Sequence, residues 1–356
     1  MRPPRETLTL VGHTANERLV SDALSGDRVP QAWLLTGPPG VGKATFAYRM
    51  ARFLLTGGGA DSGPSLFGDS APVTSLTVDA DHPAVRQIAV GSHPDLLVIE
   101  REMDEKRDKM KSAISVDQVR EISQFLHLTA SQGGWRIVLI DSADEMNTNA
   151  ANALLKILEE PPKRALLILV SHTPGRLLPT IRSRCRMLRF GPLSAEDVRT
   201  AAEAVLEGEP LDPIAITLAD GAPGRALMLA DPDTRSVLTD LLGLLRQAPN
   251  GDPATLHSFA EKLGKAAADA QYRSFIDQFD AWLMRVIRHS ARTGSVPNDL
   301  PGEAQAAEAV LRAAGSLDRL IEVWEKNAQL FRQTDGLNLD RKQAVLSALL
   351  PLTQRR

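Results

Sequence analysis

Residues 34–45 read Leu34-Leu35-Thr36-Gly37-Pro38-Pro39-Gly40-Val41-Gly42-Lys43-Ala44-Thr45, and this stretch decides the fold of the chain. An apolar run over residues 32–35 leads into a glycine-rich turn, and a helix-like segment follows over residues 45–55. The pattern G-x-x-x-x-G-K between a strand and a helix is that of a phosphate-binding loop. The alternative, a glycine-rich turn with an incidental lysine, is disfavoured because the required strand and helix are both present.

The loop has the groups that a nucleotide's phosphates need. Glycines let backbone N–H groups approach a phosphate closely, and the helix N-terminus adds partial positive charge. Lys43 is expected to reach the β- and γ-phosphates. The predicted nucleotide-binding residues of the loop are Gly37, Pro38, Pro39, Gly40, Val41, Gly42, Lys43, Ala44 and Thr45.

One position departs from the pattern, because Ala44 stands where a Ser or Thr hydroxyl would bind Mg²⁺. Thr45 is a poor replacement, since one helical step rotates its side chain by about 100°. The loop therefore predicts a nucleotide site that is not necessarily a hydrolytic one.

A second nucleotide-site feature is the apolar strand over residues 136–140, which ends at Asp141. Asp141 is expected to hold Mg²⁺ directly or through water. Hydrolytic ATPases with these two features carry a Glu next, but Ser142 stands there. Glu145 is expected to lie past the strand end, out of reach. Since a positioned base contributes about 10²–10⁴ in rate, its loss together with a metal ligand predicts binding with negligible hydrolysis.

Length, net charge and cysteine content limit the classes of function that the chain can have. A length of 356 residues suggests two or three domains, and a formal net charge of −3 provides no global basic field for nucleic acid. Cys185 is the single cysteine, which excludes a multi-cysteine zinc site and is typical of a reducing compartment. No run approaches the ~20 apolar residues of a membrane span. We therefore expect a cytoplasmic protein that holds no zinc and does not contact a membrane.

Strand and helix patterns alternate up to residue 192, which predicts an α/β domain with a parallel sheet and flanking helices. Helical patterns dominate from Ser194 onward. The predicted domains are residues 1–192, a phosphate-loop domain; residues 193–233, a small helical lid; and residues 234–356, a helical domain.

Three further segments carry local predictions. Ser115 and Gln118 form a capping box that starts a helix. The charged run over residues 100–111 indicates a solvated loop or hairpin tip. The Gly- and Asp-rich residues 56–94 indicate a surface insertion, and His82 and His93 within it are interpreted as solvated loop residues rather than metal ligands.

A dense arginine cluster follows the next buried strand, in Thr180-Ile181-Arg182-Ser183-Arg184-Cys185-Arg186. These arginines are either surface residues that pair with carboxylates or include an arginine finger offered to a nucleotide on a neighbouring subunit. A finger supplied in trans contributes about 10³–10⁵ in kcat. The residues by themselves leave both interpretations open.

Three motifs together resemble the AAA+ clamp-loader family: residues 37–43, the run Asn-Ala-Leu-Leu-Lys-Ile-Leu-Glu-Glu-Pro-Pro at residues 152–162, and Ser-Arg-Cys at residues 183–185. Within this family the chain resembles the delta prime subunits of bacterial DNA polymerase III more than the motor subunits. The segments that carry this likeness are residues 93–95, 116–120 and 133–135, and the strand ending Asp141-Ser142. The likeness covers nearly the whole chain and is weakest over residues 56–92 and 234–335.

The resemblance implies roles for particular residues. Arg184 is implied to be an arginine finger for the ATP site of an adjacent motor subunit of gamma/tau type. Arg225 lies near the sensor-2 position, and His172 occupies the sensor-1 position, which is usually Thr or Asn. Residues 234–356 are implied to form a collar. Many family members carry four zinc-binding cysteines before the Asp strand, which this chain lacks.

The implied function is that of a largely non-hydrolytic stator of the DNA polymerase III clamp loader. Its implied partners are the gamma/tau and delta subunits in a hetero-pentamer, the sliding clamp and primed DNA, and its nucleotide is ATP or ADP. The alternatives are an ATP-hydrolysing motor of gamma/tau type and, more distantly, a small-molecule kinase. Lys156, Lys163 and Arg164 are candidates for contact with the DNA backbone, or serve surface solubility.

Overall fold

The computed structural model describes residues 2–26, 29–58, 75–104, 109–111, 113–131, 134–248, 251–265, 268–337 and 339–353. The chain divides into two compact units. The first comprises Met1–Leu211 and Leu218–Leu227, and the second comprises Asp212–Thr217 and Met228–Arg356. The division into domains 1–192, 193–233 and 234–356 remains a prediction.

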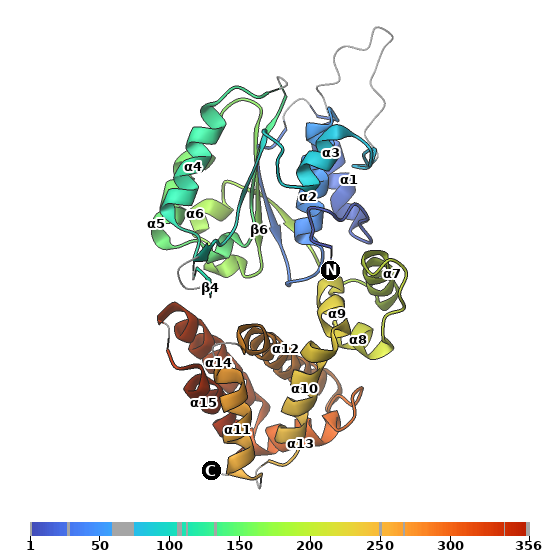
Figure 1. The fold of residues 1–356 in the computed structure, drawn as a ribbon, viewed down its shortest axis with the longest axis vertical. Helices are drawn as coiled ribbons and strands as arrows, with labels where there is room; N and C mark the ends of the chain where they lie inside the picture. The colour runs from blue at the N-terminus through green and yellow to red at the C-terminus, as the bar shows by residue number, and fades with distance from the viewer. Residues whose placement is uncertain are drawn as a thin grey trace. The chain divides into compact units, whose positions relative to one another are not determined.

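The first unit contains a five-stranded parallel sheet (Figure 1). In spatial order its strands are β2 (Leu96–Ile99), β5 (Arg136–Ile140), β6 (Ala165–Ser171), β1 (Ala32–Thr36) and β7 (Arg186–Arg189). Parallel neighbours need crossover connections, which the intervening helices supply. The predicted α/β class is therefore confirmed, and the carboxyl ends of all five strands lie at one edge of the sheet.

Side chains alternate between two cores on the two faces of the sheet. On β6, Leu166, Ile168 and Val170 enter one core, while Leu167 and Leu169 enter the other. This alternation follows from the two-residue period of a strand. Figure 1 shows helices on both sides of the sheet. The first core is covered by α1 (Thr14–Leu24), α2 (Lys43–Leu55) and α3 (Pro83–Ala89), and the second by α4 (Val116–His127), α5 (Thr148–Glu159) and α6 (Pro179–Arg182).

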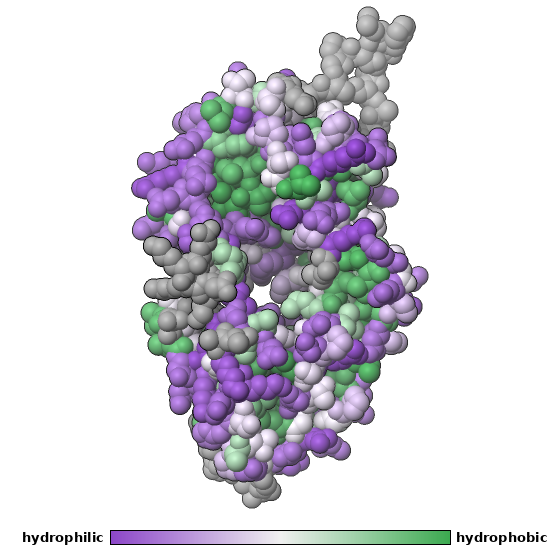
Figure 2. Space-filling model, in the orientation of Figure 1, coloured by the Kyte–Doolittle hydropathy of each residue, from purple (hydrophilic) through white to green (hydrophobic). Residues whose placement is uncertain are grey.

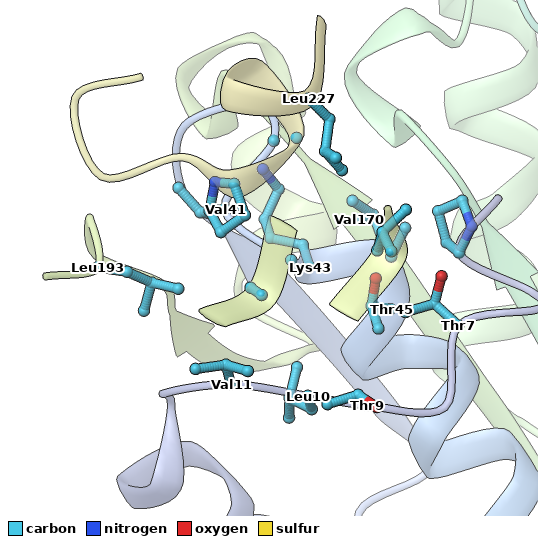
Figure 3. Close-up of a pocket in the computed structure, with 18 of the residues that line it drawn as sticks. Thr7, Thr9, Leu10, Val11, Val41, Lys43, Thr45, Val170, Leu193 and Leu227 are labelled. Atoms are coloured by element: carbon cyan, nitrogen blue, oxygen red, sulfur yellow. The ribbon is translucent and has the colours of Figure 1, made fainter. Parts of the chain in front are cut away.

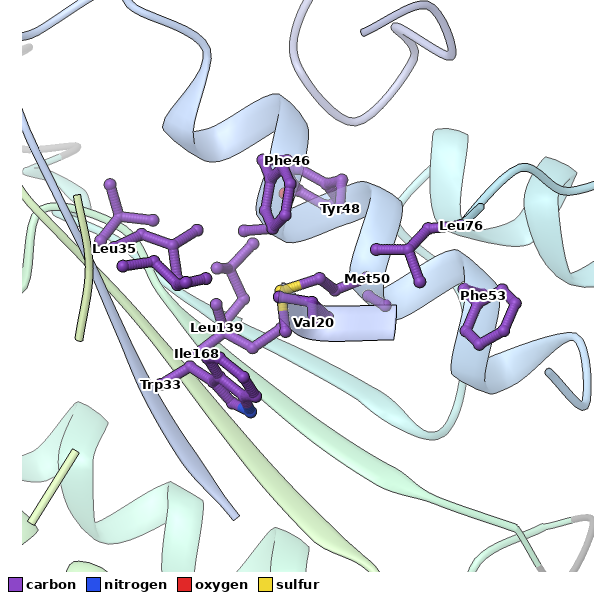
Figure 4. Packing of buried hydrophobic residues seen from close by; sticks show 14 of the residues in the cluster. Val20, Trp33, Leu35, Phe46, Tyr48, Met50, Phe53, Leu76, Leu139 and Ile168 are labelled. Carbon is purple, nitrogen blue, oxygen red and sulfur yellow. The ribbon is translucent and has the colours of Figure 1, made fainter. Parts of the chain in front are cut away.

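The core beneath α2 anchors the loop that precedes this helix. Figure 4 shows Phe46 and Met50 of α2 packed towards Trp33 and Leu35 of β1. All four side chains are fully buried. Burying a large apolar side chain contributes about 1.5–3 kcal/mol, so the strand and helix that flank the loop are held firmly.

Side-chain caps begin two helices that pack in the second core. Ser115 and Gln118 form the predicted capping box at the start of α4. Asn147 caps α5, because its side chain accepts a hydrogen bond from the Ala150 N–H. The helix predicted from the capping box at Ser115 is confirmed.

The sequence analysis missed one strand and misread one histidine. The basic segment that precedes Phe190 contains β7, an edge strand in which only Leu188 is buried, so its exposed arginines hid the strand signal. His93 is not a solvated loop residue: it is 7% exposed, and its Nδ1 accepts a hydrogen bond from the Asp95 N–H at 3.1 Å.

The charged run contains a short antiparallel hairpin of β3 (Met103–Asp104) and β4 (Lys109–Met110), and its predicted tip at residues 105–108 lies outside the described residues. Of the predicted insertion, residues 59–74 lie outside them as well, while α3 lies within residues 75–94.

The rest of the chain is helical where it is described, as predicted. In the second unit the rings of Phe275 and Phe279 stack with their centroids 5.4 Å apart, and Trp282 is buried as well. Figure 2 shows mainly hydrophilic residues on the face in view, with apolar residues gathered in patches. None of the described helices is long and apolar enough to cross a membrane. The helices are α7 (Ala195–Val205), α8 (Pro213–Leu218), α9 (Pro223–Ala230), α10 (Pro232–Leu245), α11 (Pro253–Gly264), α12 (Asp269–Thr293), α13 (Glu303–Ala314), α14 (Leu317–Leu337) and α15 (Arg341–Thr353).

Candidate nucleotide site and arginine segment

A cavity of about 250 Å³ lies at the carboxyl edge of the sheet. Its lining includes the predicted loop residues Gly40 to Thr45 together with Asp141 and Ser142. Figure 3 shows apolar side chains from several elements around Lys43, among them Leu10, Val41 and Leu227. Ligands of open α/β sheets bind at this edge, so the cavity is the candidate nucleotide site.

Glycines shape the loop at its closest contacts. Gly37 has φ 149° and Gly42, the N-cap of α2, has φ 100°. A Cβ at position 37 would lie 2.2 Å from the Phe190 carbonyl oxygen, so a side chain cannot be accommodated there. The loop thus packs directly on the backbone at the end of β7.

Lys43 is enclosed by its own loop. It is 2% exposed, and its Nζ donates to the carbonyl oxygens of Gly37 and Pro38, both at 2.6 Å. Burial lowers the pKa of Lys43 to about 8, against the opposing influence of Asp141 and Asp144. To reach a phosphate, the ammonium has to exchange these carbonyl oxygens for phosphate oxygens.

The start of α9 contacts the loop backbone to backbone. The Gly224 N–H donates to the Gly40 carbonyl oxygen at 2.9 Å. A Cβ on Gly224 would lie 2.9 Å from the Gly40 Cα, so only glycine fits this approach. Among the described residues, Pro223, Gly224 and Leu227 of α9 line the cavity and Arg225 does not. A nucleotide role for Arg225 therefore remains a prediction.

The ends of β5 and β6 meet beside Lys43. Ser142, with φ 57°, shares a hydrogen bond between its Oγ and His172 Nε2 at 3.2 Å. Asp144 is buried and accepts hydrogen bonds from the backbone N–H groups of His172 at 3.0 Å and Thr173 at 3.1 Å. Asp144 thereby fixes the turn that follows β6. The sequence analysis missed this role, although the second Asp in Asp141-Ser142-Ala143-Asp144 was a visible signal.

Burial is the largest influence on the pKa values of Asp141 and His172. It raises the pKa of Asp141, as does Glu100, while Lys43 opposes the rise. Burial and the charge of Lys43 lower the pKa of His172 to about 4, so its imidazole is neutral at pH 7. Glu145 pairs with Arg101 at 2.7 Å and does not line the cavity within the described part of the chain. Among the described residues, Asp141 is the one carboxylate in the cavity lining, and none of the other lining residues stands in for the Glu missing at position 142.

A buried arginine that the sequence analysis missed holds the N-terminal segment, part of which lines the cavity. Arg52 of α2 is 1% exposed and donates to the carbonyl oxygens of Thr7 at 3.0 Å, Arg5 at 2.6 Å and Pro4 at 3.3 Å. Burial lowers its pKa to about 10. Arg52 thus ties the N-terminal segment, whose Thr7 and Thr9 line the cavity, to the helix that begins at Lys43.

Arg184 lies elsewhere, between α6 and β7. Its Nη2 donates to Glu159 Oε1 at 2.7 Å and its Nη1 to the Thr180 carbonyl oxygen at 3.0 Å. The side chains of Arg184 and Glu159 are 33% and 51% exposed. Next to Arg184, Cys185 packs on the second core, and burial raises the pKa of its thiol to about 12.

Comparison with known proteins identifies the family. The profile described as "DNA polymerase III, delta subunit" matches residues 12–194, which is more than half of the chain. The DNA polymerase III subunit delta prime of Pseudomonas aeruginosa is 34% identical over 266 residues, covering 72% of this chain and 72% of that protein.

The chain belongs to the delta prime family of DNA polymerase III.

Other relatives include a second delta prime subunit and a gamma/tau subunit of DNA polymerase III. The Escherichia coli delta prime subunit is 31% identical over 239 residues, which is 66% of this chain and 65% of that protein, just under two thirds of its length. The gamma/tau subunit of Mycobacterium bovis is 28% identical over 258 residues, which is 68% of this chain and 40% of that protein.

Solved structures resemble this delta prime family member only weakly. A DNA polymerase III gamma subunit-related protein of Thermotoga maritima is 17% identical with a TM-score of 0.34, covering 91% of this chain and 94% of that one. The Thermotoga maritima RuvB Holliday junction branch migration motor is 17% identical with a TM-score of 0.39, covering 91% and 90%. Likenesses this weak add nothing to the assignment.

Proposed function

We propose that this chain is a stator of the DNA polymerase III clamp loader: it binds ATP or ADP without hydrolysing it efficiently and acts on the nucleotide of a neighbouring subunit. Its relatives are named as delta prime and gamma/tau subunits of DNA polymerase III. The proposed partners are therefore gamma/tau and delta subunits, the sliding clamp and primed DNA.

The residues of the phosphate loop and its cavity favour nucleotide binding over nucleotide hydrolysis. Backbone N–H groups at the start of α2 and the Lys43 ammonium are the groups that would hold the phosphates. Asp141 lines the same cavity and is the residue that would hold Mg²⁺. Ala44 provides no hydroxyl for the metal, and Ser142 is tied to His172 and has no carboxylate to orient an attacking water. These residues thus favour a cradle that retains nucleotide.

One observation carries the proposed action in trans: Arg184 is part-exposed and does not line the chain's own cavity in the described part of the structure. Its Nε–H and one hydrogen on each Nη are left over after the bonds to Glu159 and Thr180. An arginine placed in this way can present a fork of N–H groups to phosphates of another subunit.

The test is reconstitution with gamma/tau and delta subunits, followed by measurement of ATP turnover with clamp and primed DNA. We expect Arg184→Ala to assemble normally and to lower kcat at the site it serves by about 10³ or more. Unchanged turnover and unchanged clamp loading by this variant would show that Arg184 is an ordinary surface residue.

A motor of gamma/tau type is the second candidate, because a gamma/tau subunit is among the relatives. The purified chain separates the two functions without any partner. Steady phosphate release by the isolated wild type, lost in Lys43→Ala, would establish a motor and overturn the stator. A stator releases no phosphate in either form.

Direct DNA contact is a lesser part of the proposal. Lys156, Lys163 and Arg164 are exposed, as an electrostatic contact with the DNA backbone requires. Replacing Lys156 and Lys163 by Ala should lower the salt dependence of DNA binding by the assembled complex. An unchanged dependence on salt would assign these residues to surface solubility.

A further inference from the structure

Two of the three motifs that carry the family resemblance, residues 152–162 and 183–185, meet at one ion pair. Glu159 is the last residue of α5, and Arg184 lies between α6 and β7. Their side chains join at 2.7 Å, Glu159 Oε1 to Arg184 Nη2, across 25 residues of sequence. A second bond, from Nη1 to the Thr180 carbonyl oxygen, holds the other arm of the guanidinium. The arginine is thus held at both arms although it is part-exposed.

The backbone on each side of this pair is fixed by burial. Leu158, which precedes Glu159, and Ile181, which precedes the arginine by one turn, belong to the same hydrophobic core. Cys185, which follows Arg184, packs against that core as well. The pair therefore joins two rigid anchors, and its geometry is set by the core rather than by mobile loops.

A free arginine side chain on a surface samples many rotamers, and ordering it on binding lowers the rate of any step that needs it. The bonds to Glu159 and Thr180 remove much of that freedom in advance. They leave the Nε–H and one hydrogen on each Nη for a phosphate, so the arginine need not leave Glu159 when it acts. The carboxylate also lies at the C-terminal end of α5, where the helix dipole favours a neighbouring cation.

We propose that Glu159 is a positioning residue that holds Arg184 ready for the nucleotide of the neighbouring subunit. This inference rests on the proposed action of Arg184 in trans and adds the residue that prepares it. Glu159 touches neither nucleotide nor metal in this scheme, and its effect passes through the guanidinium.

The experiment uses the complex of this chain with gamma/tau and delta subunits, and measures kcat and KM for ATP with clamp and primed DNA. We expect Glu159→Ala to lower kcat by about three- to tenfold, with KM and assembly unchanged. Glu159→Gln should recover most of the rate, because its amide oxygen still accepts from Nη2. Glu160→Ala is the matched control, since it removes the same charge one residue away, and it should behave as wild type.

A double-mutant cycle separates positioning from a general structural role. In the Arg184→Ala background, Glu159→Ala should cause no further loss, because the group it positions is absent. An equal loss in both backgrounds, a wild-type rate, or a faster rate for Glu159→Ala overturns the positioning role while leaving the action of Arg184 intact. A wild-type rate for Arg184→Ala itself overturns the proposed function, and the role of Glu159 with it.

Discussion

The phosphate loop and the Arg184 segment lie in the same unit, but their cations are held in opposite ways. Lys43 is 2% exposed and bonded to two carbonyl oxygens of its own loop. Arg184 is 33% exposed and held by a surface ion pair and one carbonyl oxygen. Exposed ion pairs contribute about 0–1 kcal/mol, so the pair with Glu159 orients Arg184 without burying its remaining N–H groups. The Lys43 ammonium is therefore closed off by its own loop, whereas part of the Arg184 guanidinium is accessible from outside the chain.

The nucleotide site and the Arg184 segment also differ in which functional groups they carry. The nucleotide site has the glycines and lysine of its loop, but it lacks a hydroxyl at Ala44 and, after β5, a carboxylate at Ser142. The Arg184 segment has the cation and, in Glu159, a group that orients it. The predictions below change one side of this comparison at a time, beginning with the largest expected effect.

The first prediction concerns the fork of Arg184. We expect Arg184→Lys to lose most of what Arg184→Ala loses, on the order of 10³ in kcat at the served site, because a lysine ammonium lacks the planar set of N–H groups. Turnover of the reconstituted complex checks this. Near-normal turnover of the lysine variant would mean that Arg184 acts through its charge alone.

The second prediction concerns Arg52, the buried counterpart of Arg184. Arg52→Met should lower the free energy of unfolding of the first unit by about 2 kcal/mol, because the hydrogen bonds from the buried guanidinium to the N-terminal segment are lost. Urea titration followed by tryptophan fluorescence measures the change. The exposed Arg86 is the control, and Arg86→Met should shift stability by less than about 0.5 kcal/mol. Equal shifts for both variants would contradict the buried role of Arg52.

The third prediction uses pH to test how well the cavity excludes water. The pKa of His172 is lowered from 6.5 to about 4, so the unfolded chain binds this proton more readily than the folded one. Its contribution to stability is complete above pH 6.5 and is lost as pH falls towards 4. Wild type should therefore lose up to about 2 kcal/mol between pH 7.5 and 5, relative to His172→Asn. Comparing the two cancels other titrating groups. A pH-independent difference between them would show a solvated imidazole.

The fourth and smallest effect comes from restoring the missing hydroxyl. Ala44→Ser should tighten Mg²⁺-dependent nucleotide binding by about fivefold, equivalent to ~1 kcal/mol, without producing turnover, because Ser142 still lacks a carboxylate. Calorimetric titration with and without EDTA measures the affinity, and phosphate release measures turnover. Steady hydrolysis by this single variant would place the block to catalysis at Ala44 alone.

Much of the fold could be predicted from local patterns. Continuous apolar runs marked β1, β2, β5 and β6, and the capping box at Ser115 marked the start of α4. The edge strand β7 escaped because an edge strand carries exposed arginines and buries only Leu188. His93 was misread because its neighbours are polar, while its burial comes from the fold around it.

The sequence by itself determined the family, the parallel sheet, the phosphate loop, and the Ala44 and Ser142 that stand where a hydroxyl and a carboxylate were expected. These are properties of residue type and short spacing, which local physical chemistry can read. The tertiary structure alone decided that Arg52 ties the N-terminal segment to α2, that Asp144 fixes the turn after β6, and that Glu159 pairs with Arg184. Each of these contacts joins segments far apart in the chain, and which distant side chains meet depends on how the sheet and its two cores pack.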